Sequence, residues 1–413
     1  MINVIENCRI CGNANLIPIL DLGDQSLTGV FHSPKEEIDR APLVLVKCFD
    51  TDASKSCGLV QLKHTYELSK MYGENYGYRS SLNSSMVDHL EEMVKELLEF
   101  NIDLNTNDLV IDIGSNDGTT LNSYPNIDAT LIGIDPTAKY FKKYYKNNIN
   151  IIDDFFTAEK IRTLFPEKKA KIITSFSMFY DLEDPQSFTN EVADLLDEQG
   201  IWVLEQSYLP LMLKNNSFDT ICHEHLEYYA LRQIHWLFDK AGLKIIDVRF
   251  NMVNGGSFRV YAAKKTSMRS VNHSVIEKII AEEKEMQLDK MKPYEDFCFR
   301  VEKLKYELID KLNLINKLGK TVFGLGASTK GNVLLQYYNL NSSQLNAIGE
   351  VNADKFGKVT PGSLIPIEDE KLILEKKPDY LLVLPWHFKS FFQNNKRFDG
   401  IKLIFPLPAV EEI

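Results

Sequence analysis

Acidic residues at the expected ends of three neighbouring strands give the strongest chemical signal in this chain. Residues 110–118 read Val-Ile-Asp-Ile-Gly-Ser-Asn-Asp-Gly, an acidic strand end followed by a glycine turn that opens a helix. Glycine lets a backbone pass close to a ligand, and the N-terminus of a helix offers unpaired N–H groups. The carboxylates of Asp112 and Asp117 would repel a pyrophosphate but suit a cationic cofactor that carries an amino acid. The turn also lacks the Gly-x-Gly-x-x-Gly pattern of dinucleotide-binding proteins.

Two further strand ends complete a predicted nucleoside site. Asp135 ends the next expected strand, where a carboxylate can accept both ribose hydroxyls. Asp154 and Phe155 follow the strand after that, where an adenine can stack on an aromatic ring beside an acid. The pattern indicates S-adenosylmethionine, and the alternatives are another nucleotide or a degenerate site. The predicted cofactor contacts are Asp112, Gly114, Asn116, Asp117, Gly118, Asp135, Asp154 and Phe155.

Four of the six cysteines fall within the first 57 residues. Cys8 and Cys11 form a Cys-x2-Cys knuckle, the spacing with which two thiolates bind one tetrahedral zinc ion. Cys48 and Cys57 would complete a four-cysteine site, with a polar loop between them. A redox pair with two incidental cysteines is the alternative, but the thioredoxin-like strand-to-helix turn that it needs is missing. Because four cysteines leave no open position, the predicted Zn²⁺ is structural.

The segment that contains His223, Glu224 and His225 could bind a metal, act as an acid–base centre or form a hydrogen-bonded structural pair. A metal is disfavoured because no further ligand cluster is evident. The segment follows the fourth strand of the expected sheet, where a substrate would meet a methyl donor. A histidine oriented by a carboxylate is a suitable general base there. The candidate catalytic residues are His225, Glu224 and Cys222, and simple packing of the Cys222 thiol is the alternative.

A second glycine turn lies at residues 324–331, which read Gly-Leu-Gly-Ala-Ser-Thr-Lys-Gly. It resembles a phosphate-binding strand-to-helix turn, in which Lys330 and the helix N-terminus suit a diphosphate. Glu350 ends the next expected strand, which keeps open a nicotinamide cofactor and an oxidoreductase activity. A structural α/β unit with a vestigial loop is a further alternative.

The elements that position these residues form a repeating pattern. Short apolar strands, most of them separated by helical patterns, are expected at 108–114, 130–135, 171–175, 200–205, 244–248, 320–326, 343–349 and 379–385. Charged helices are expected over 272–318. Alternating strands and helices predict parallel sheets. The predicted fold class is therefore α/β, with a small N-terminal zinc-binding module, a central Rossmann-like class I methyltransferase domain and a second Rossmann-like α/β domain.

Composition excludes several classes of protein. The 413 residues include 47 Lys and Arg against 58 Asp and Glu, and this net charge of −11 argues against a nucleic-acid binder. No apolar run approaches the roughly 18 residues of a membrane span. The N-terminus lacks the basic start and apolar core of a signal peptide, so we expect a cytoplasmic protein. Six cysteines are too few for a disulfide scaffold of this length.

Together these motifs resemble the sugar C-methyltransferase family of deoxysugar biosynthesis, over nearly the whole chain. The resemblance rests on the cysteine module, both glycine turns, the His-Glu-His segment and the stretches 20–23, 76–80, 254–257 and 324–332. It implies a monomeric three-domain enzyme that uses S-adenosylmethionine and acts on a nucleotide-linked 4-keto-6-deoxy sugar. The implied parts are a zinc-binding module (1–70), a methyltransferase domain with a leading helix (71–265), linking helices (266–318) and a C-terminal domain that contributes to nucleotide-sugar binding (319–413).

The resemblance also implies a mechanism. The C3 proton of such a sugar is acidic because the carbanion delocalises into the C4 ketone as an enolate. A histidine that matches His225 removes this proton, Glu224 assists, and the enolate carbon attacks the methyl group in line with the departing sulfur. Tyr76 and Tyr78 then line the substrate cavity. Substrate contacts of the C-terminal domain are expected from Lys330 and Asn332.

The chain departs from the antibiotic-sugar members of this family at positions that face the sugar. Those members carry Tyr in place of Cys222, and Asn and His within the segment 175–181. Ser177, Tyr180 and Asp181 are therefore predicted to contact a different substituent or another nucleotide-linked carbonyl compound. O- or N-methylation of a related sugar is the alternative among enzymes. A zinc-bearing protein that binds S-adenosylmethionine without turnover is the alternative outside them.

Overall fold

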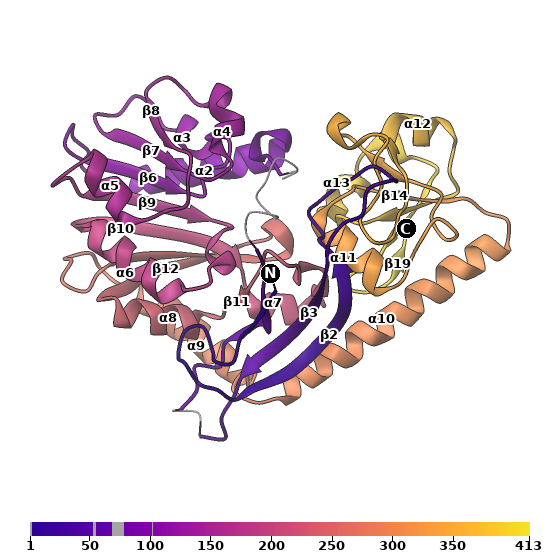
Figure 1. Cartoon of the computed structure of the whole chain (residues 1–413), viewed down its shortest axis with the longest axis horizontal. Coiled ribbons are helices and arrows are strands. Elements are labelled where there is room, and N and C mark those ends of the chain that lie inside the picture. Colours follow the sequence, from indigo (N-terminus) through magenta and orange to yellow (C-terminus); the bar gives the residue numbers. More distant parts are fainter. Residues whose placement is uncertain (1, 53–54, 68–77, 101) are drawn as a thin grey trace.

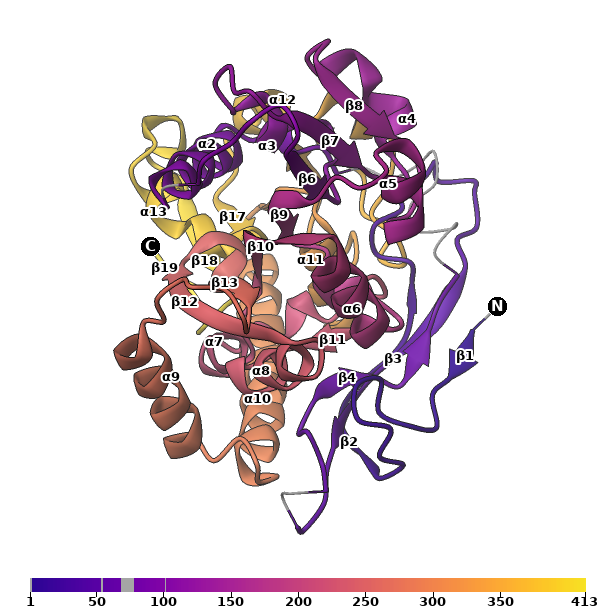
Figure 2. The same cartoon turned by 90° about the vertical axis from the view of Figure 1, so that its left-hand side faces the viewer.

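The computed structural model describes residues 2–52, 55–67, 78–100 and 102–413. Figure 1 shows two α/β domains side by side, with N-terminal strands running between and below them and a long helix along the outer edge of the C-terminal domain. Figure 2, turned by 90°, shows the N-terminal strands along one side of the central domain. No helix among the described residues combines the length and the apolar character needed to cross a bilayer.

The central domain is built on a seven-stranded sheet in the order β12-β13-β10-β9-β6-β7-β8, in which only β13 runs opposite to its neighbours. Its strands are β6 (Leu109–Ile113), β7 (Thr130–Ile134), β8 (Ile149–Ile152), β9 (Ala170–Phe176), β10 (Leu196–Ser207), β12 (Leu243–Asn251) and β13 (Ser257–Lys264). All five residues of β6 are buried, as expected of a central parallel strand covered on both faces. The chain order reverses between β6 and β9, so the carboxyl ends of these strands form the crevice where open α/β sheets bind ligands.

Helices cover both faces of this sheet (Figures 1 and 2). They are α2 (Ser84–Glu99), α3 (Thr119–Asn122), α4 (Ala138–Phe141), α5 (Ala158–Leu164), α6 (Pro185–Leu195), α7 (Leu209–Lys214) and α8 (Leu231–Lys240). Asp184 caps α6 by accepting the N–H of Ser187, and Thr157 caps α5 by accepting that of Lys160.

The C-terminal domain repeats the same architecture on a six-stranded sheet in the order β16-β15-β14-β17-β18-β19. Its elements are β14 (Val322–Leu325), α11 (Thr329–Tyr337), β15 (Ile348–Glu350), β16 (Ile367–Asp369), α12 (Glu370–Glu375), β17 (Tyr380–Val383), α13 (Lys389–Gln393), β18 (Lys402–Phe405) and β19 (Glu411–Glu412). The first five strands of that order are parallel, and the order reverses between β14 and β17. The strand expected from residue 343 starts only at Ile348, because side-chain hydrogen bonds of Asn341 and Gln344 close a turn before it.

The N-terminal module is an antiparallel sheet that borrows a strand from the central domain. Strands β2 (Leu16–Ser26), β3 (Arg40–Cys48) and β4 (Val60–Leu62) are followed at the edge by β11 (Glu227–Tyr228). A separate pair joins β1 (Asn3–Val4) to β5 (His64–Thr65). The module is therefore bonded to the segment that carries the His-Glu-His motif.

Two helices link the domains, as the charged helical pattern predicts. They are α9 (His273–Glu285) and α10 (Lys292–Lys317). Residues at helical spacing along α10 are buried: Tyr294, Phe297, Val301, Leu304, Leu308, Leu312 and Ile315. This face packs on α7, β2 and β14, so α10 touches all three parts of the chain. The predicted α/β fold class is confirmed.

Candidate active site

The carboxyl ends of β6 and β9 open into a cavity of about 310 Å³. Its position at the reversal of strand order is the one expected for a ligand of this fold. Six of the eight residues predicted to contact a cofactor line this cavity: Asp112, Gly114, Asn116, Asp135, Asp154 and Phe155.

Two carboxyl groups of the cavity wall are held by hydrogen bonds. Thr174 Oγ1 donates to Asp112 Oδ1 over 2.5 Å, and burial raises the pKa of Asp112 to about 7. Asp135 accepts the N–H of Asn116 at 2.9 Å and that of Thr137 at 2.7 Å. Each carboxyl group keeps acceptor capacity for the amino or hydroxyl groups of a cofactor.

Asp117 and Gly118 are not among the residues that line the cavity. Asp117 is fully buried and accepts hydrogen bonds from Thr119 Oγ1 at 2.6 Å and from the N–H of Ser81 at 3.0 Å. Gly118 has a φ of +78°, and a Cβ there would lie 2.6 Å from the ring of Tyr145. In this arrangement Asp117 ties the segment before α2 to the glycine turn, and Gly118 lets the turn close.

Asp154 and Phe155 follow β8 and line the outer part of the cavity. The side chain of Asp154 is 55% exposed and pairs with Lys160 Nζ at 2.7 Å, and Phe155 is 44% exposed. A large aromatic ring that remains this exposed at the edge of a cavity offers a surface on which a planar base can stack.

A second cavity, of about 320 Å³, lies next to the first and between the three parts of the chain. Four residues line both cavities: Tyr78, Met86, Ser177 and Asp181. The remaining wall consists of Gly29, Phe31, Asn83, Tyr180, Ser207, Glu224, His225, Asn254, Ser328, Thr329, Lys330, Lys355, Pro385, His387 and Phe388. A molecule in the second cavity would therefore adjoin a cofactor in the first.

Most, but not all, of the predicted substrate contacts line the second cavity. Five of them line the second cavity: Tyr78, Ser177, Tyr180, Asp181 and Lys330. Tyr76 lies outside the described residues. Asn332 is fully buried and lines neither cavity, because its side-chain amide donates to the carbonyl of Thr28 at 2.7 Å.

Ser177 stands at the junction of the two cavities in an unusual backbone conformation. Its φ is +53°, in the left-handed region that side chains other than glycine seldom adopt. Its N–H donates to the carbonyl of Glu205 at 2.8 Å, which holds the turn after β9 against β10. Strained backbone of this kind gathers at ligand sites.

His225 follows the 3-10 turn η4 (Phe218–Thr220) and precedes β11. Its Nδ1 lies 2.8 Å from the carbonyl oxygen of Thr220, which can only accept, so Nδ1 carries the proton and the neutral ring keeps its lone pair on Nε2. Burial, together with the nearby charge of Lys330, lowers the pKa of His225 to about 4. The segment follows β10. In chain order β10 is the fifth strand of its domain and not the fourth as expected, because the strand β8 lies between β7 and β9.

The neighbours of His225 differ in their surroundings. Glu224 lines the second cavity, burial raises its pKa, and its Oε1 would lie 2.5 Å from a Cβ built on Gly29. His223 is fully buried and donates from Nε2 to the carbonyl of Ala41 at 3.2 Å. Cys222 is fully buried, does not line either cavity, and burial holds its pKa well above the ordinary thiol value. The thiol is therefore uncharged and packed.

Two lysines of the C-terminal domain, Lys330 and Lys355, line the second cavity. Lys330 lies in the first turn of α11, and its Nζ donates to the carbonyl of Asn254 at 2.6 Å. Lys355 Nζ donates to the carbonyl of Ala327 at 2.7 Å and lies 3.6 Å from Glu350 Oε2. Since the N-terminus of a helix is also electropositive, this wall suits a negatively charged group.

Glu350 lines neither of the two cavities. Its carboxylate accepts the backbone N–H groups of Ala327, Val351 and Asn352, and it pairs with Lys355. The acid that would have to bind a nicotinamide ribose is thus held by its own turn.

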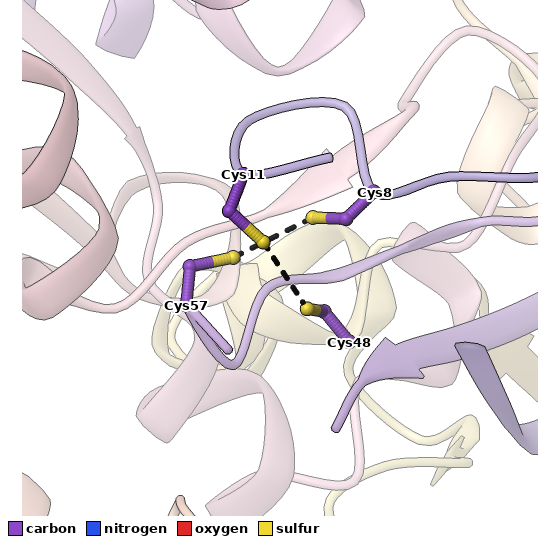
Figure 3. A group of neighbouring side chains, drawn as sticks. All are labelled: Cys8, Cys11, Cys48 and Cys57. Carbon is purple, nitrogen blue, oxygen red and sulfur yellow. Dashed lines mark hydrogen bonds between the residues drawn. The ribbon is translucent and has the colours of Figure 1, made fainter. Parts of the chain in front are cut away.

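The four N-terminal cysteines converge on one point, as Figure 3 shows. Their sulfur atoms all lie within 4.8 Å of one another, and two pairs are 3.5 Å apart: Cys8 with Cys57, and Cys11 with Cys48. A zinc–sulfur bond of about 2.3 Å places tetrahedral sulfur ligands roughly 3.8 Å apart. The cluster therefore has the size and ligand set of a structural zinc site, and the predicted site is confirmed.

Backbone and side-chain donors surround these sulfur atoms. The N–H of Leu59 donates to Cys57 Sγ at 3.4 Å, and Asn13 Nδ2 donates to Cys48 Sγ at 3.5 Å. Such donors stabilise thiolates that share a metal ion.

Twelve wall residues of the second cavity were not among the predicted site residues, and they include Gly29, Phe31, Lys355 and His387. The rule that ligands bind at the carboxyl ends of parallel strands indicates His387 after β17 as a candidate, with a solvent-facing histidine as the alternative, and the same rule applied to β15 could have found Lys355. Gly29 and Phe31 lie on a loop of the N-terminal module and carry no local signal.

Comparisons with known protein families cover three successive segments of the chain. Residues 8–72 match the family described as "Putative zinc binding domain", residues 86–248 match "Methyltransferase domain", and residues 252–408 match "C-methyltransferase C-terminal domain". The chain is 30% identical over 415 residues to C-methyltransferase NovU of Streptomyces niveus, covering 99% of this chain and 97% of that protein.

Solved structures similar to the chain cover a smaller part of it. The YcgJ protein from Bacillus subtilis is 16% identical, with a TM-score of 0.33, and covers 42% of this chain and 97% of its own. Magnesium protoporphyrin IX methyltransferase from Synechocystis PCC 6803 is 14% identical, with a TM-score of 0.33, and covers 48% of this chain and 92% of its own.

Proposed function

Since this chain belongs to the S-adenosylmethionine-dependent C-methyltransferase family that joins a zinc-binding domain, a methyltransferase domain and a C-terminal domain, we propose that it methylates a carbon atom of a nucleotide-linked, 4-keto-6-deoxy sugar. The observation that carries the proposal is the pair of adjoining cavities. The first has acidic and aromatic walls, and the second contains His225 and two lysines.

The cofactor occupies the first cavity in this proposal. S-adenosylmethionine, when bound, supplies an electrophilic methyl group. Asp112 faces its cationic part, Asp135 accepts its ribose hydroxyls, and Asp154 and Phe155 contact its base. Gly114 and Asn116 complete the turn that encloses it, while Asp117 and Gly118 support that turn from outside the cavity.

His225 is the general base for the sugar carbon next to the ketone. Its Nδ1–H is engaged by Thr220, so its Nε2 is the ring nitrogen that accepts the proton. A low pKa keeps the ring neutral, and therefore able to accept a proton, at physiological pH. Glu224 assists as a neighbour with a raised pKa, and Tyr180, whose ring centroid lies 4.2 Å from that of His225, fixes the ring orientation.

The sugar and its nucleotide divide the second cavity between them. Tyr78, Ser177 and Asp181, which line both cavities, contact the sugar where it meets the methyl donor. Lys355 and the first turn of α11 face the negatively charged part of the substrate, and Lys330 contacts the sugar in the cavity that His225 also lines. Cys222 acts through packing in the buried core.

Incubation with S-adenosylmethionine and dTDP-4-keto-6-deoxyglucose, followed by mass spectrometry, tests the proposal. We expect a product heavier by one methylene group. His225→Ala should abolish the product while the affinity for S-adenosylmethionine, measured by calorimetry, stays unchanged. An active His225→Ala variant would rule out the assigned base.

Incubation in deuterium oxide distinguishes C-methylation from O- or N-methylation. C-methylation removes a carbon-bound proton of the sugar, so the protein should exchange this proton with solvent when S-adenosylhomocysteine replaces the methyl donor, whereas O- or N-methylation leaves the proton in place. A protein that binds S-adenosylmethionine but releases no S-adenosylhomocysteine with any sugar nucleotide would be a binding protein and not an enzyme.

A further inference from the structure

Lys330 occupies a position that a phosphate ligand does not explain. It extends from the first turn of α11 into the second cavity, and its Nζ donates to the backbone carbonyl of Asn254. Asn254 has a φ of +56°, so a strained turn of the central domain presents this carbonyl to the lysine. An ammonium group has three N–H donors, and the hydrogen bonds of the described residues account for one of them.

The ammonium group lies close to the proposed base. Burial lowers the pKa of His225 and of His387, and the charge of Lys330 lowers both further; all three side chains line the same cavity. Burial lowers the pKa of Lys330, and the charge of Asp219 opposes this effect, while Asp219 Oδ2 accepts the indole N–H of Trp386 at 2.8 Å. Lys330 is thus held between two domains, at the cavity that His225 also lines.

We propose that Lys330 is a catalytic residue that donates a hydrogen bond to the enolate oxygen produced when His225 removes the proton from the sugar carbon. This inference rests on the proposed function. His225 Nε2 takes the proton, the C–H electron pair forms the carbon–carbon double bond, and the carbonyl π pair moves onto oxygen. The N–H bond of Lys330 stays intact, and its positive charge faces the new negative charge.

The same charge serves the step before proton removal. A cation beside an imidazole disfavours imidazolium, so Lys330 helps to keep His225 neutral. After the transfer, the imidazolium and the ammonium group flank one enolate anion. One cation therefore supports both the base and the product of its reaction.

Lys355 provides the matched comparison. It lines the same cavity, but its Nζ lies 3.6 Å from Glu350 Oε2 and 4.4 Å from the ring centroid of Phe31. Its charge is shared with a carboxylate of its own domain, and its ammonium group lies over an aromatic ring of the N-terminal module. Lys355 is therefore placed to hold the nucleotide part of the substrate and not the reacting carbonyl.

Solvent exchange of the sugar proton tests this division of roles without methyl transfer. Wild type, Lys330→Met, Lys330→Arg and Lys355→Met are incubated with dTDP-4-keto-6-deoxyglucose and S-adenosylhomocysteine in deuterium oxide, and exchange is followed by NMR. Loss of one oxyanion donor reduces rates by about 10²–10³-fold, which we expect for Lys330→Met, with partial recovery in Lys330→Arg. The affinity of Lys330→Met for dTDP should stay within about threefold, whereas Lys355→Met should weaken it.

The pH profile adds a readout that a structural role would not move. His225 contacts the ring of Tyr180 and the carbonyl of Thr220, and the other titratable groups of its cavity are Tyr78, Asp181, Glu224, Lys330, Lys355 and His387. Removing the lysine charge should move the acid limb of kcat/KM in Lys330→Met to higher pH, while burial of His225 keeps it below the ordinary histidine value of about 6.5. Lys355→Met should leave that limb in place.

Several results would overturn the inference. A proton-exchange rate of Lys330→Met within about fivefold of the wild-type rate would do so. Loss of dTDP binding in Lys330→Met, together with an unshifted acid limb of kcat/KM, would also do so and would assign Lys330 to the phosphates. Failure of the proposed function looks different, because wild type itself would then neither exchange the proton nor form product. Circular dichroism of each variant establishes that it is folded.

Discussion

Arg9 and Glu227 face each other inside the protein, with Arg9 Nε 3.8 Å from Glu227 Oε1 and both side chains nearly inaccessible to solvent. Arg9 lies between the two cysteines of the zinc knuckle, and Glu227 begins β11, two residues after His225. Arg9 also donates to the carbonyls of Leu62 at 2.7 Å and His64 at 3.2 Å. The zinc site and the proposed base are thus connected through one buried arginine.

Arg9→Met should therefore destabilise the fold and reduce turnover while zinc stays bound. The substitution leaves the carbonyls of Leu62 and His64 without a donor, and we expect the free energy of unfolding to fall by about 3 kcal/mol. Urea denaturation and zinc analysis would measure the two effects. A variant as stable as wild type would show that the arginine does not couple the module to β11.

Removal of zinc should act through the same connection. Chelation, or Cys48→Ser, should lower both the thermal midpoint and the methyl-transfer rate, because the knuckle no longer fixes Arg9. Differential scanning calorimetry before and after re-addition of zinc would follow the effect. Full activity of a zinc-free protein would contradict this expectation.

Cofactor affinity should depend on pH through Asp112. Burial raises the pKa of this carboxyl group to about 7, so it is partly protonated near neutral pH when the cofactor is absent. A cationic ligand favours the carboxylate, so binding should release a proton and tighten by up to about tenfold from pH 6 to pH 8. Calorimetry in buffers of different ionisation enthalpy would count the proton, and Asp112→Asn should lose the dependence. Equal wild-type affinity at both pH values would exclude it.

Gly29→Ala tests the contact between the N-terminal module and Glu224. The new Cβ would lie 2.5 Å from Glu224 Oε1, so the flexible carboxyl group must move. The φ of Gly29 lies outside the left-handed region, so alanine fits the backbone. Since small displacements at a reacting centre can slow catalysis about 10²-fold, we expect a fall of roughly tenfold to hundredfold in kcat/KM. A stable variant with wild-type kinetics would show that the position of Glu224 is unimportant.

Asn332→Ala should affect stability and not nucleotide binding. The side chain is fully buried and bonds to Thr28 of the N-terminal module, so its loss should lower the free energy of unfolding by about 1–2 kcal/mol. The affinity for dTDP should be unchanged in a calorimetric titration. Weaker dTDP binding with unaltered stability would restore Asn332 to the substrate contacts expected from the sequence.

Local patterns in the sequence were sufficient for the framework. Strands such as β6 are continuous apolar runs, and the four cysteines have few competing chemical roles, so the fold class and the zinc site could both be predicted. The type of residue at each strand end was equally informative. The direction in which each of these side chains points could not be predicted. Asp117 lies in the turn that follows the strand of Asp112, yet its carboxylate accepts the N–H of Ser81 and does not line the cavity.

Contacts between residues far apart in the sequence could not be predicted from such local patterns. Gly29 and Phe31 reach the second cavity only because the N-terminal module packs across both domains. β11 has two residues, too few for any periodicity, and its pairing with β4 depends on the folded central domain. The role of a residue such as Lys355 likewise depends on which domain it faces.

The pairing of β11 with β4 also sets an order for synthesis on the ribosome. Gln61 pairs with Glu227, so the sheet of the N-terminal module stays open along β4 until most of the central domain has been translated. An unpaired strand edge readily recruits other chains, and nascent multidomain proteins are vulnerable at this stage. The four cysteines precede β4, so they can bind zinc early in synthesis. The edge of β4 would then remain unpaired until β11 has been translated. The module is therefore a poor candidate for expression on its own, since the strand that seals it belongs to a later part of the chain.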